Sequence, residues 1–135
     1  MLRNEELLHT MKRWAILGLD ENPRGYANLI YDRLLKRGKT VAGVNAMYSQ
    51  LPGKEVYTSL HKLPFKPDVV VSVVRPEVGL FYLEEMRNYG MKILWLQPGT
   101  VDEQLLKRAQ EFKIEILQAC VLVSLDFVEH LDDRE

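Results

Sequence analysis

The sequence is poor in the residues that mark several large classes of protein. Cys120 is the only cysteine in 135 residues, so an intramolecular disulfide is impossible. His9, His61 and His130 lie far apart along the chain and form no metal-ligand motif, so we expect no metal site. No apolar run approaches the ~20 residues that a membrane-spanning helix needs, and residues 1–14 hold no apolar core suited to a signal peptide. We therefore expect a cytoplasmic protein that does not enter a membrane.

Neither sign of charge is in excess. The 18 Lys and Arg residues against 19 Asp and Glu leave a net charge of −1, which gives no case for binding nucleic acid. The length suits one domain, and 47% hydrophobic residues suffice for a core. We predict a single domain over residues 1–135.

The stretch over residues 14–38 organises the rest of the chain. A short apolar run ends at Gly18, a polar turn follows, and Tyr26, Ile30 and Leu34 then recur at helical spacing. A strand, a glycine turn and a helix form the opening unit of a nucleotide-binding α/β sheet. Backbone N–H groups at such a helix start attract phosphate.

Four further strands are predicted, at residues 41–44, 69–74, 92–96 and 114–117, with residues 46–56 between the second and third as a loop. Helices separate the later strands, so we expect a five-stranded parallel α/β sheet of order 3-2-1-4-5 with helices on both faces. The switch point then lies between strands 1 and 4. The turns at 18–25 and 97–99 should flank one crevice there, and Asn45 and Arg75 end neighbouring strands at the same edge.

The helix that begins at Pro76 is predicted to bury Val78, Tyr82, Met86 and Tyr89, which recur on one face. Leu80 and Phe81 lie off that face. They are candidates for a homodimer contact, although scattered exposed apolar residues are normal.

The first turn departs from the dinucleotide-binding fingerprint. Of the three glycine positions, Gly18 matches, whereas Asp20 and Pro23 do not. Asn45 stands where an NAD-binding domain has an acidic residue. These departures disfavour a nicotinamide-nucleotide enzyme or sensor without excluding it.

The same turn has a plain interpretation and a functional one. In the plain one, Asn22 caps the helix and Pro23 is its first residue. The functional one adds Arg24 as a phosphate partner, with Gly25 allowing a ligand to approach.

The other crevice candidates also have two interpretations each. Arg75 could bind an anion or form a surface ion pair. Gln97 could offer its side-chain amide to a ligand, with Gly99 keeping the turn open, or both residues could simply form an ordinary turn. Cys120 could face the crevice, although a lone cysteine is more often a small buried hydrophobe.

Five segments together resemble the small single-domain CoA-binding proteins, whose fold matches the CoA-binding domain of the succinyl-CoA synthetase alpha subunit. They are WAILGLDENPRGY, VAGVN, VYTSL, VVVSVVRPEV and ILWLQPGT, within roughly residues 12–122. The resemblance implies a Rossmann-like domain that binds coenzyme A or an acyl-CoA without catalysis of its own. It places the ligand over Gly18 to Tyr26 and near Asn45, Arg75 and Gln97.

The chain departs from that family's pattern at the phosphate contacts. Family members usually carry a small hydroxyl residue near Gly25 and often Pro and a basic residue after the asparagine, where this chain has Ala46 and Met47. The missing cation and the added Asp20 should weaken phosphate binding. No nucleophile and base converge, so we expect no catalytic residues. The remaining alternative is an interaction protein that has lost its nucleotide.

Overall fold

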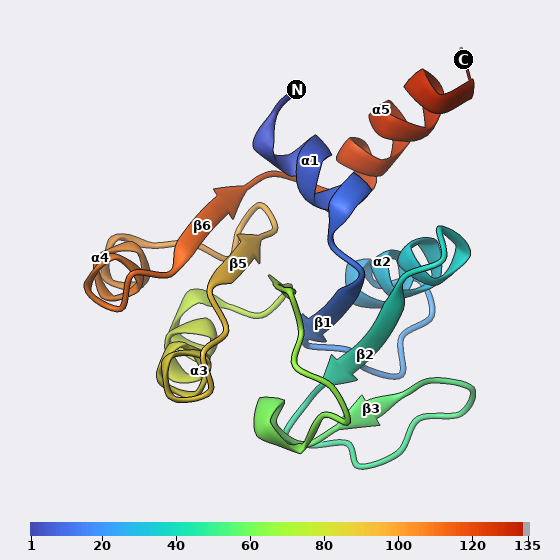
Figure 1. Cartoon of the computed structure of the whole chain (residues 1–135). Helices are drawn as coiled ribbons and strands as arrows, with labels where there is room; N and C mark the ends of the chain where they lie inside the picture. The colour runs from blue at the N-terminus through green and yellow to red at the C-terminus, as the bar shows by residue number, and fades with distance from the viewer. Residues whose placement is uncertain (134–135) are drawn as a thin grey trace.

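The computed structural model describes residues 1–133, and its strands form one parallel sheet (Figure 1). The strands are β1 (Arg13–Leu17), β2 (Thr40–Val44), β3 (Val56–Tyr57), β4 (Val69–Ser72), β5 (Ile93–Leu96) and β6 (Glu115–Gln118). The helices are α1 (Arg3–Thr10), α2 (Tyr26–Lys36), η1 (Leu60–Lys62), α3 (Pro76–Asn88), α4 (Glu103–Glu111) and α5 (Val121–Asp133).

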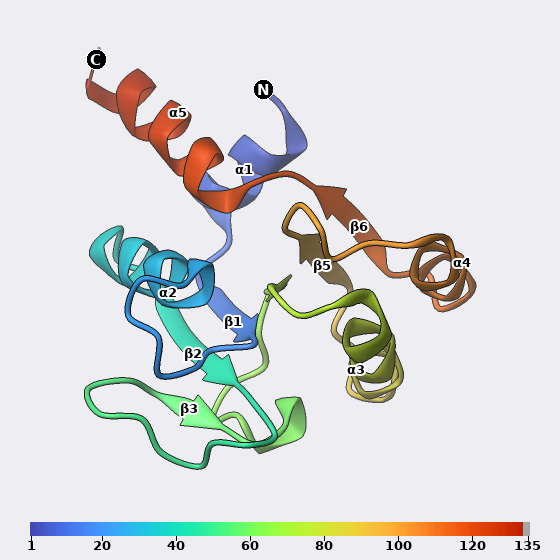
Figure 2. The same cartoon turned by 180° about the vertical axis from the view of Figure 1, so that it is seen from behind.

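Side-chain alternation along the strands divides the core into two layers. Trp14 and Ile16 of β1 pack with α1, α2 and α5, whereas Ala15 and Leu17 pack with α3, α4 and η1. The two views of the ribbon show these helix groups on opposite sides of the sheet (Figures 1 and 2). The inner strands β1, β2, β4 and β5 are buried on both faces along nearly all of their length, as a parallel sheet requires, whereas the edge strand β6 is partly exposed.

The predicted fold class is confirmed, but the sheet has six strands rather than five, in the order β3-β2-β1-β4-β5-β6. The strand missed by sequence is the two-residue β3, which begins at the last residue of the region interpreted as a loop and pairs with Gly43 and Val44. It takes the place beside β2 that we assigned to the strand starting at Val69.

That strand, β4, lies instead on the other side of β1, with Trp14 opposite Val69. The strand order therefore again reads 3-2-1-4-5 when the strands are renumbered, followed by a sixth strand. The strand beside β2, however, is β3 and not the strand that starts at Val69. The switch point lies between β1 and β4, so the turn after β4 adjoins the turn after β1. The turn at Gln97 is one strand farther away than predicted.

Two helix predictions are also wrong in detail. Helix α2 begins at Tyr26 with Gly25 as its N-cap, so Asn22 does not cap it and Pro23 is not its first residue. Helix α3 buries Gly79, Leu83 and Met86, so of the four residues predicted to face inward only Met86 is fully buried. Most of the predicted face is turned outward, because Val78 and Tyr89 are exposed and Tyr82 is half-buried.

Candidate functional site

A cavity of about 440 Å³ lies at the carboxyl ends of β4, β5 and β6, beside the start of α2. This is the edge at which ligands bind in open parallel sheets. Four predicted site residues line it, together with Cys120 and an apolar wall. The full lining is Tyr26, Val73, Val74, Arg75, Gln97, Pro98, Gly99, Thr100, Cys120 and Val123.

The turn after β1 is held by its own polar groups. Gly18 has a φ of +101°, and a Cβ there would lie 2.9 Å from Val74 Cγ1, so glycine is needed on both counts. Asp20 Oδ1 accepts a hydrogen bond from Asn22 N at 2.9 Å, and Asn22 Oδ1 accepts one from Arg24 N at 3.1 Å. These contacts explain why Asn22 belongs to the turn and not to the helix.

Asn28 anchors the turn from below and is a residue that sequence analysis missed. Its side chain is buried, and Nδ2 donates to the carbonyl oxygens of Asp20 and Asn22 at 2.7 and 2.8 Å. The sequence did hold a signal for this role, namely a polar residue on the apolar face of a predicted helix, because a buried amide needs hydrogen-bond partners.

The start of α2 is open toward a ligand. Gly25 provides no side-chain cap, so the first backbone N–H groups of the helix remain available to an anion. Tyr26, the first helical residue, lines the cavity, and Arg24 before it is exposed.

Asn45 is engaged in local structure and does not line the cavity. Its Nδ2 donates to Leu19 O at 3.1 Å, and its Oδ1 accepts from Met47 N at 2.9 Å. Asn45 thereby joins the turn after β1 to the segment after β2.

Arg75 lies at the mouth of the cavity. Its side chain is 79% exposed, and its Nε is 3.4 Å from Glu77 Oε1. The residue is also the N-cap of α3. A long exposed ion pair contributes little, so the guanidinium is free to turn toward an anion.

Gln97 is committed to the protein interior. It is buried, its Oε1 accepts a hydrogen bond from Val121 N, and its Nε2 donates to Cys120 Sγ at 3.6 Å. The amide predicted to meet a ligand instead fixes the start of α5 and the cysteine beside it. Gly99 has a φ of +88° and open space around it, so the turn carries no side chain at this position.

The remaining predicted residues do not line the cavity: four lie in the turn between β1 and α2, and Asn45 follows β2. These residues are Gly18, Asp20, Arg24, Gly25 and Asn45. The negative charge of Glu21, then partial desolvation, then the charge of Asp20 raise the pKa of Tyr48 in the segment after β2.

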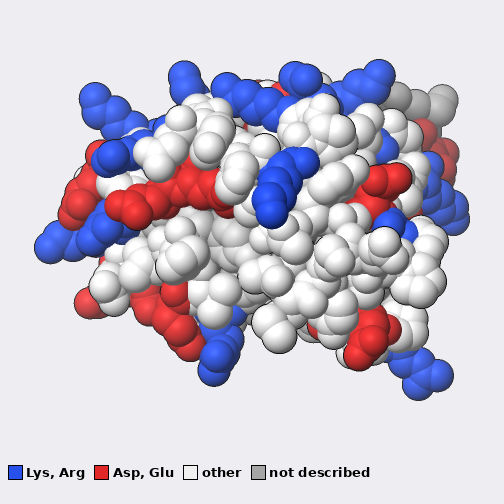
Figure 3. All heavy atoms as spheres, turned by 90° about the horizontal axis from the view of Figure 1, so that it is seen from below, with Lys and Arg blue, Asp and Glu red and all other residues white. Residues whose placement is uncertain are grey.

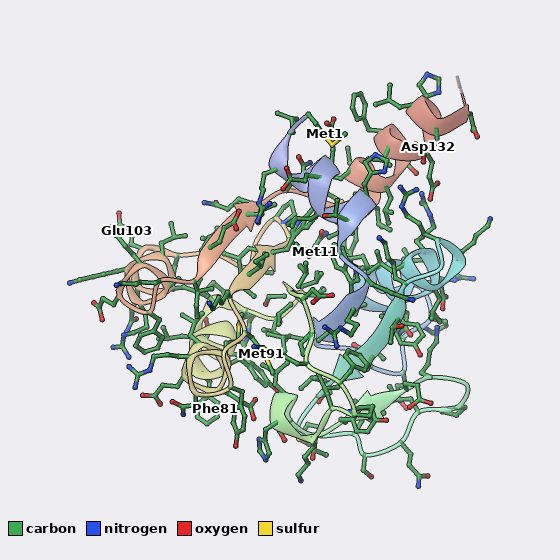
Figure 4. The ribbon with its side chains drawn as sticks, in the orientation of Figure 1. Met1, Met11, Phe81, Met91, Glu103 and Asp132 are labelled. Carbon is green, nitrogen blue, oxygen red and sulfur yellow. The ribbon has the colours of Figure 1, made fainter. Side chains whose placement is uncertain are left out.

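A larger groove of about 760 Å³ runs along the outer side of α3, facing Ala46 and residues 58–61. Phe81 lies in it and is 83% exposed, at the lower side of α3 in Figure 4. Seen from below, this side of the molecule has a broad neutral area between charged groups (Figure 3). The groove holds no glycine turn and none of the predicted site residues, so we take the smaller cavity as the candidate site.

Within residues 1–133, no three His, Cys, Asp or Glu side chains gather as a group that could hold a metal ion. None of the helices over the same residues is long and apolar enough to cross a membrane.

Comparison with known proteins identifies the family. The uncharacterized protein YneT of Bacillus subtilis is 24% identical over 121 residues, covering 89% of this chain and 90% of YneT. A hypothetical protein of Pyrococcus horikoshii has a TM-score of 0.85 at 29% identity, over 94% of this chain and 92% of its own. A conserved hypothetical protein of Pyrococcus furiosus has a TM-score of 0.73 at 36% identity, over 79% of this chain and 92% of its own.

Part of a larger enzyme shares the fold. An acetyl-coenzyme A synthetase 1 of Ca. Korarchaeum cryptofilum has a TM-score of 0.67 at 22% identity, over 82% of this chain and 27% of the enzyme. The sequence model described as "CoA binding domain" matches residues 12–126. The chain thus belongs to the CoA-binding domain family, which confirms the resemblance drawn from its five segments.

Proposed function

We propose that this protein binds coenzyme A or an acyl-CoA in the cavity at the carboxyl edge of the sheet. The observation that carries the proposal is the meeting of Tyr26, Arg75 and Gly99 around one cavity in a member of this family. Each came from a different segment of the resemblance, and together they border a space suited to a small ligand.

The walls of the cavity suit the parts of such a ligand. Arg75 and the uncapped start of α2 can hold phosphate groups through charge and backbone N–H donors. Val73, Val74 and Val123 offer an apolar wall to the pantetheine arm. The Cys120 side chain lines the same space and reports on its occupancy.

We propose further that binding is not accompanied by catalysis. None of the described cavity-lining residues is His, Asp or Glu, so no general base accompanies the Cys120 thiol. The partner of Cys120 Sγ is the amide of Gln97, which does not accept a proton as a base does. The purified chain should release no free thiol from acetyl-CoA.

The decisive experiment combines thermal shift with alkylation of Cys120. CoA, acetyl-CoA, NAD, NADP and ATP are each added, and the iodoacetamide reaction at Cys120 is followed by mass spectrometry. We expect CoA or acetyl-CoA to raise the melting temperature and to slow alkylation. A response to NAD or NADP alone would favour the nicotinamide alternative. If none of the five compounds at millimolar concentration changes the melting temperature or the rate of alkylation, the result would favour an interaction protein that has lost its nucleotide.

A further inference from the structure

The amino edge of the sheet, opposite the candidate cavity, carries a row of cations. A basic residue lies at or shortly before the start of four strands, and these residues are Lys12 and Arg13 at β1, Lys66 before β4, Lys92 before β5 and Lys113 before β6. All five are exposed. Because the strands run parallel, their starts share one edge of the sheet. We call these five residues the basic edge.

The basic edge is continuous from β1 to β6. Backbone hydrogen bonds of 2.8 Å join Asp68 N to Arg13 O and Glu115 N to Lys92 O, so the pairing of the strands extends to these residues. The Lys66 side chain reaches the turn before β5, where its Nζ lies 3.0 Å from the place of a Cβ added to the glycine of that turn. Neighbouring strands lie ~4.8 Å apart, so the row extends over roughly 14 Å.

Two carboxylates beside the basic edge are already paired with arginines. Asp68 Oδ2 accepts a hydrogen bond from Arg13 N at 2.9 Å, and Asp68 Oδ1 lies 3.4 Å from Arg13 Nη2. Glu115 accepts two hydrogen bonds from the Arg3 guanidinium, at 2.7 and 2.9 Å. Within residues 1–133, the four lysines of the basic edge form no ion pair. In Figure 3, Lys and Arg side chains gather along the upper border of the molecule.

Lys113 occupies a backbone position that favours glycine. It is the second residue after α4 and has a φ of +57°. The equivalent positions after α2 and α3 hold Gly38 and Gly90, with φ of +89° and +71°. A side chain in this left-handed conformation costs stability that a glycine would avoid. The fold alone therefore does not account for a lysine at this place, and its positive charge is what distinguishes it from the two glycines.

A row of exposed lysines has the chemistry of a phosphate-binding surface. An ammonium group is a point charge that contacts phosphate oxygens without reading the bases. A nucleic-acid strand presents its phosphates along a line, as the basic edge presents its cations, whereas an anionic membrane presents its charge over a plane. The net charge of −1, from which we drew no case for nucleic acid, averages this edge with the rest of the chain.

We propose that the basic edge binds the phosphate backbone of a nucleic acid without preference for sequence. The cavity of the proposed function lies at the carboxyl edge, so the two sites are separate and can be occupied together. With about one phosphate contact for each lysine, the slope of log K against log salt should be roughly −4 on duplex DNA and roughly −3 on a single strand.

The test is fluorescence anisotropy of a labelled oligonucleotide of mixed sequence, as a single strand and as a duplex, titrated with the full chain at several salt concentrations. Lys113→Gly is the most informative variant, because it removes one charge and places the favoured residue in the left-handed position. It should not lower the melting temperature. It should weaken binding about tenfold at low salt and make the salt slope shallower by about one.

Two further variants separate this edge from charge in general. Lys92→Gln, at an exposed position, should weaken binding as Lys113→Gly does, and the two changes together should weaken it more than either alone. Lys107→Gln, at an exposed position of α4, is the matched control. It removes the same charge and should leave binding close to that of the native chain.

Several results would overturn the proposal. One is oligonucleotide binding that the Lys92 and Lys113 variants leave unchanged, and another is no binding at low salt. Binding to vesicles of phosphatidylserine and phosphatidylcholine, but to neither oligonucleotide, would assign the basic edge to a membrane instead. Excess acetyl-CoA should not displace the oligonucleotide, since displacement would place the nucleic acid in the cavity. None of these results decides whether CoA binds, which the thermal-shift experiment tests separately.

Discussion

Asn28 holds the carbonyl oxygen of Asp20 through a 2.7 Å hydrogen bond from its buried side chain. The same Nδ2 atom donates to Asn22 O at 2.8 Å, so one amide of α2 fixes both sides of the turn. The position of Asp20, and of the open start of α2, thus depends on a buried residue that does not itself line the cavity.

Replacing Asn28 by Asp tests this role, because the shape is kept while both donated hydrogen bonds are lost. A buried carboxylate facing two carbonyl oxygens should lower the free energy of unfolding by roughly 2–4 kcal/mol. Urea denaturation measures the loss, and Asn88→Asp, at an exposed position of α3, is the control. Equal stability of the Asn28→Asp variant and the native chain would show that the turn is held by other contacts.

Gly43 makes room for the same turn from the side of β2. A Cβ built on Gly43 would lie 2.2 Å from Leu19 Cδ2 and 2.4 Å from Leu19 Cβ. Because Leu19 is buried, it cannot withdraw, and Gly43→Ala should cost roughly 1–3 kcal/mol of stability through overpacking. Gly79→Ala is the control, since its added Cβ would lie 3.1 Å from the tip of Leu105 and at ordinary contact distances of 3.7 and 3.9 Å from Ser72 and Val74. A Gly43→Ala variant no less stable than Gly79→Ala would contradict this packing argument.

The fold was predictable as far as local patterns determine it. Apolar runs, glycine turns and helical spacing identified the five longer strands and the parallel α/β class. The two-residue β3 left no such pattern, since its pairing with Gly43 and Val44 comes from the neighbouring strand and not from its own sequence. Strand order is likewise a tertiary property, so the side of β1 on which β4 lies was assigned wrongly.

The site was predictable in position and less so in the role of each residue. The ends of the strands indicated the right edge of the sheet, and Tyr26, Arg75, Gln97 and Gly99 do meet there. What the sequence could not reveal is which polar side chains already have partners inside the protein. Gln97 is bound to the start of α5 and Asn45 to the turn after β1, and both partners are distant in the chain.

The ion pair between Arg3 and Glu115 predicts a pH dependence. Hydrogen bonds from Arg3 Nε and Nη2, at 2.7 and 2.9 Å, join α1 to β6 and lower the pKa of Glu115. A lowered pKa in the folded state means that the pair stabilises above the ordinary carboxyl value and is lost as the pH falls through the folded value.

The effect of Glu115→Gln should therefore be present at pH 7 and vanish under acid conditions. Both side chains are about 40% exposed, so solvent screening limits the loss at pH 7 to roughly 1 kcal/mol or less. Denaturation curves at pH 7 and pH 3 measure it, with the exposed Glu84→Gln as control. A deficit that grows in acid would have the wrong sign for this pair.

The groove along α3 gives the homodimer prediction a more specific form. Phe81 is 83% exposed, whereas Leu80 is half-buried and packs against the core on the α3 side of the sheet. We expect a dimer in light scattering and a monomer for Phe81→Glu, since a charge on an apolar contact removes its driving force. Phe127→Glu, on the exposed face of α5, should leave the dimer intact. A native chain that remains monomeric at high concentration would disprove the prediction.

The last prediction concerns Arg24 and Arg75, the two arginines at the carboxyl edge of the sheet. If CoA binds as proposed, its pyrophosphate needs cations, and Arg24 and Arg75 are the candidates beside the open start of α2. A charge-assisted hydrogen bond contributes roughly 1.5–3 kcal/mol. Removing either guanidinium should therefore weaken binding about tenfold or more, since ~1.4 kcal/mol is tenfold.

Titration of Arg24→Ala and Arg75→Ala at fixed salt measures these losses. The loss should be similar for CoA and acetyl-CoA, because the pyrophosphate is common to them. Glu77→Gln is the matched control. It removes the carboxylate 3.4 Å from Arg75 Nε, so it should leave binding unchanged or tighten it slightly. Native affinity in both arginine variants would mean that the phosphates lie elsewhere.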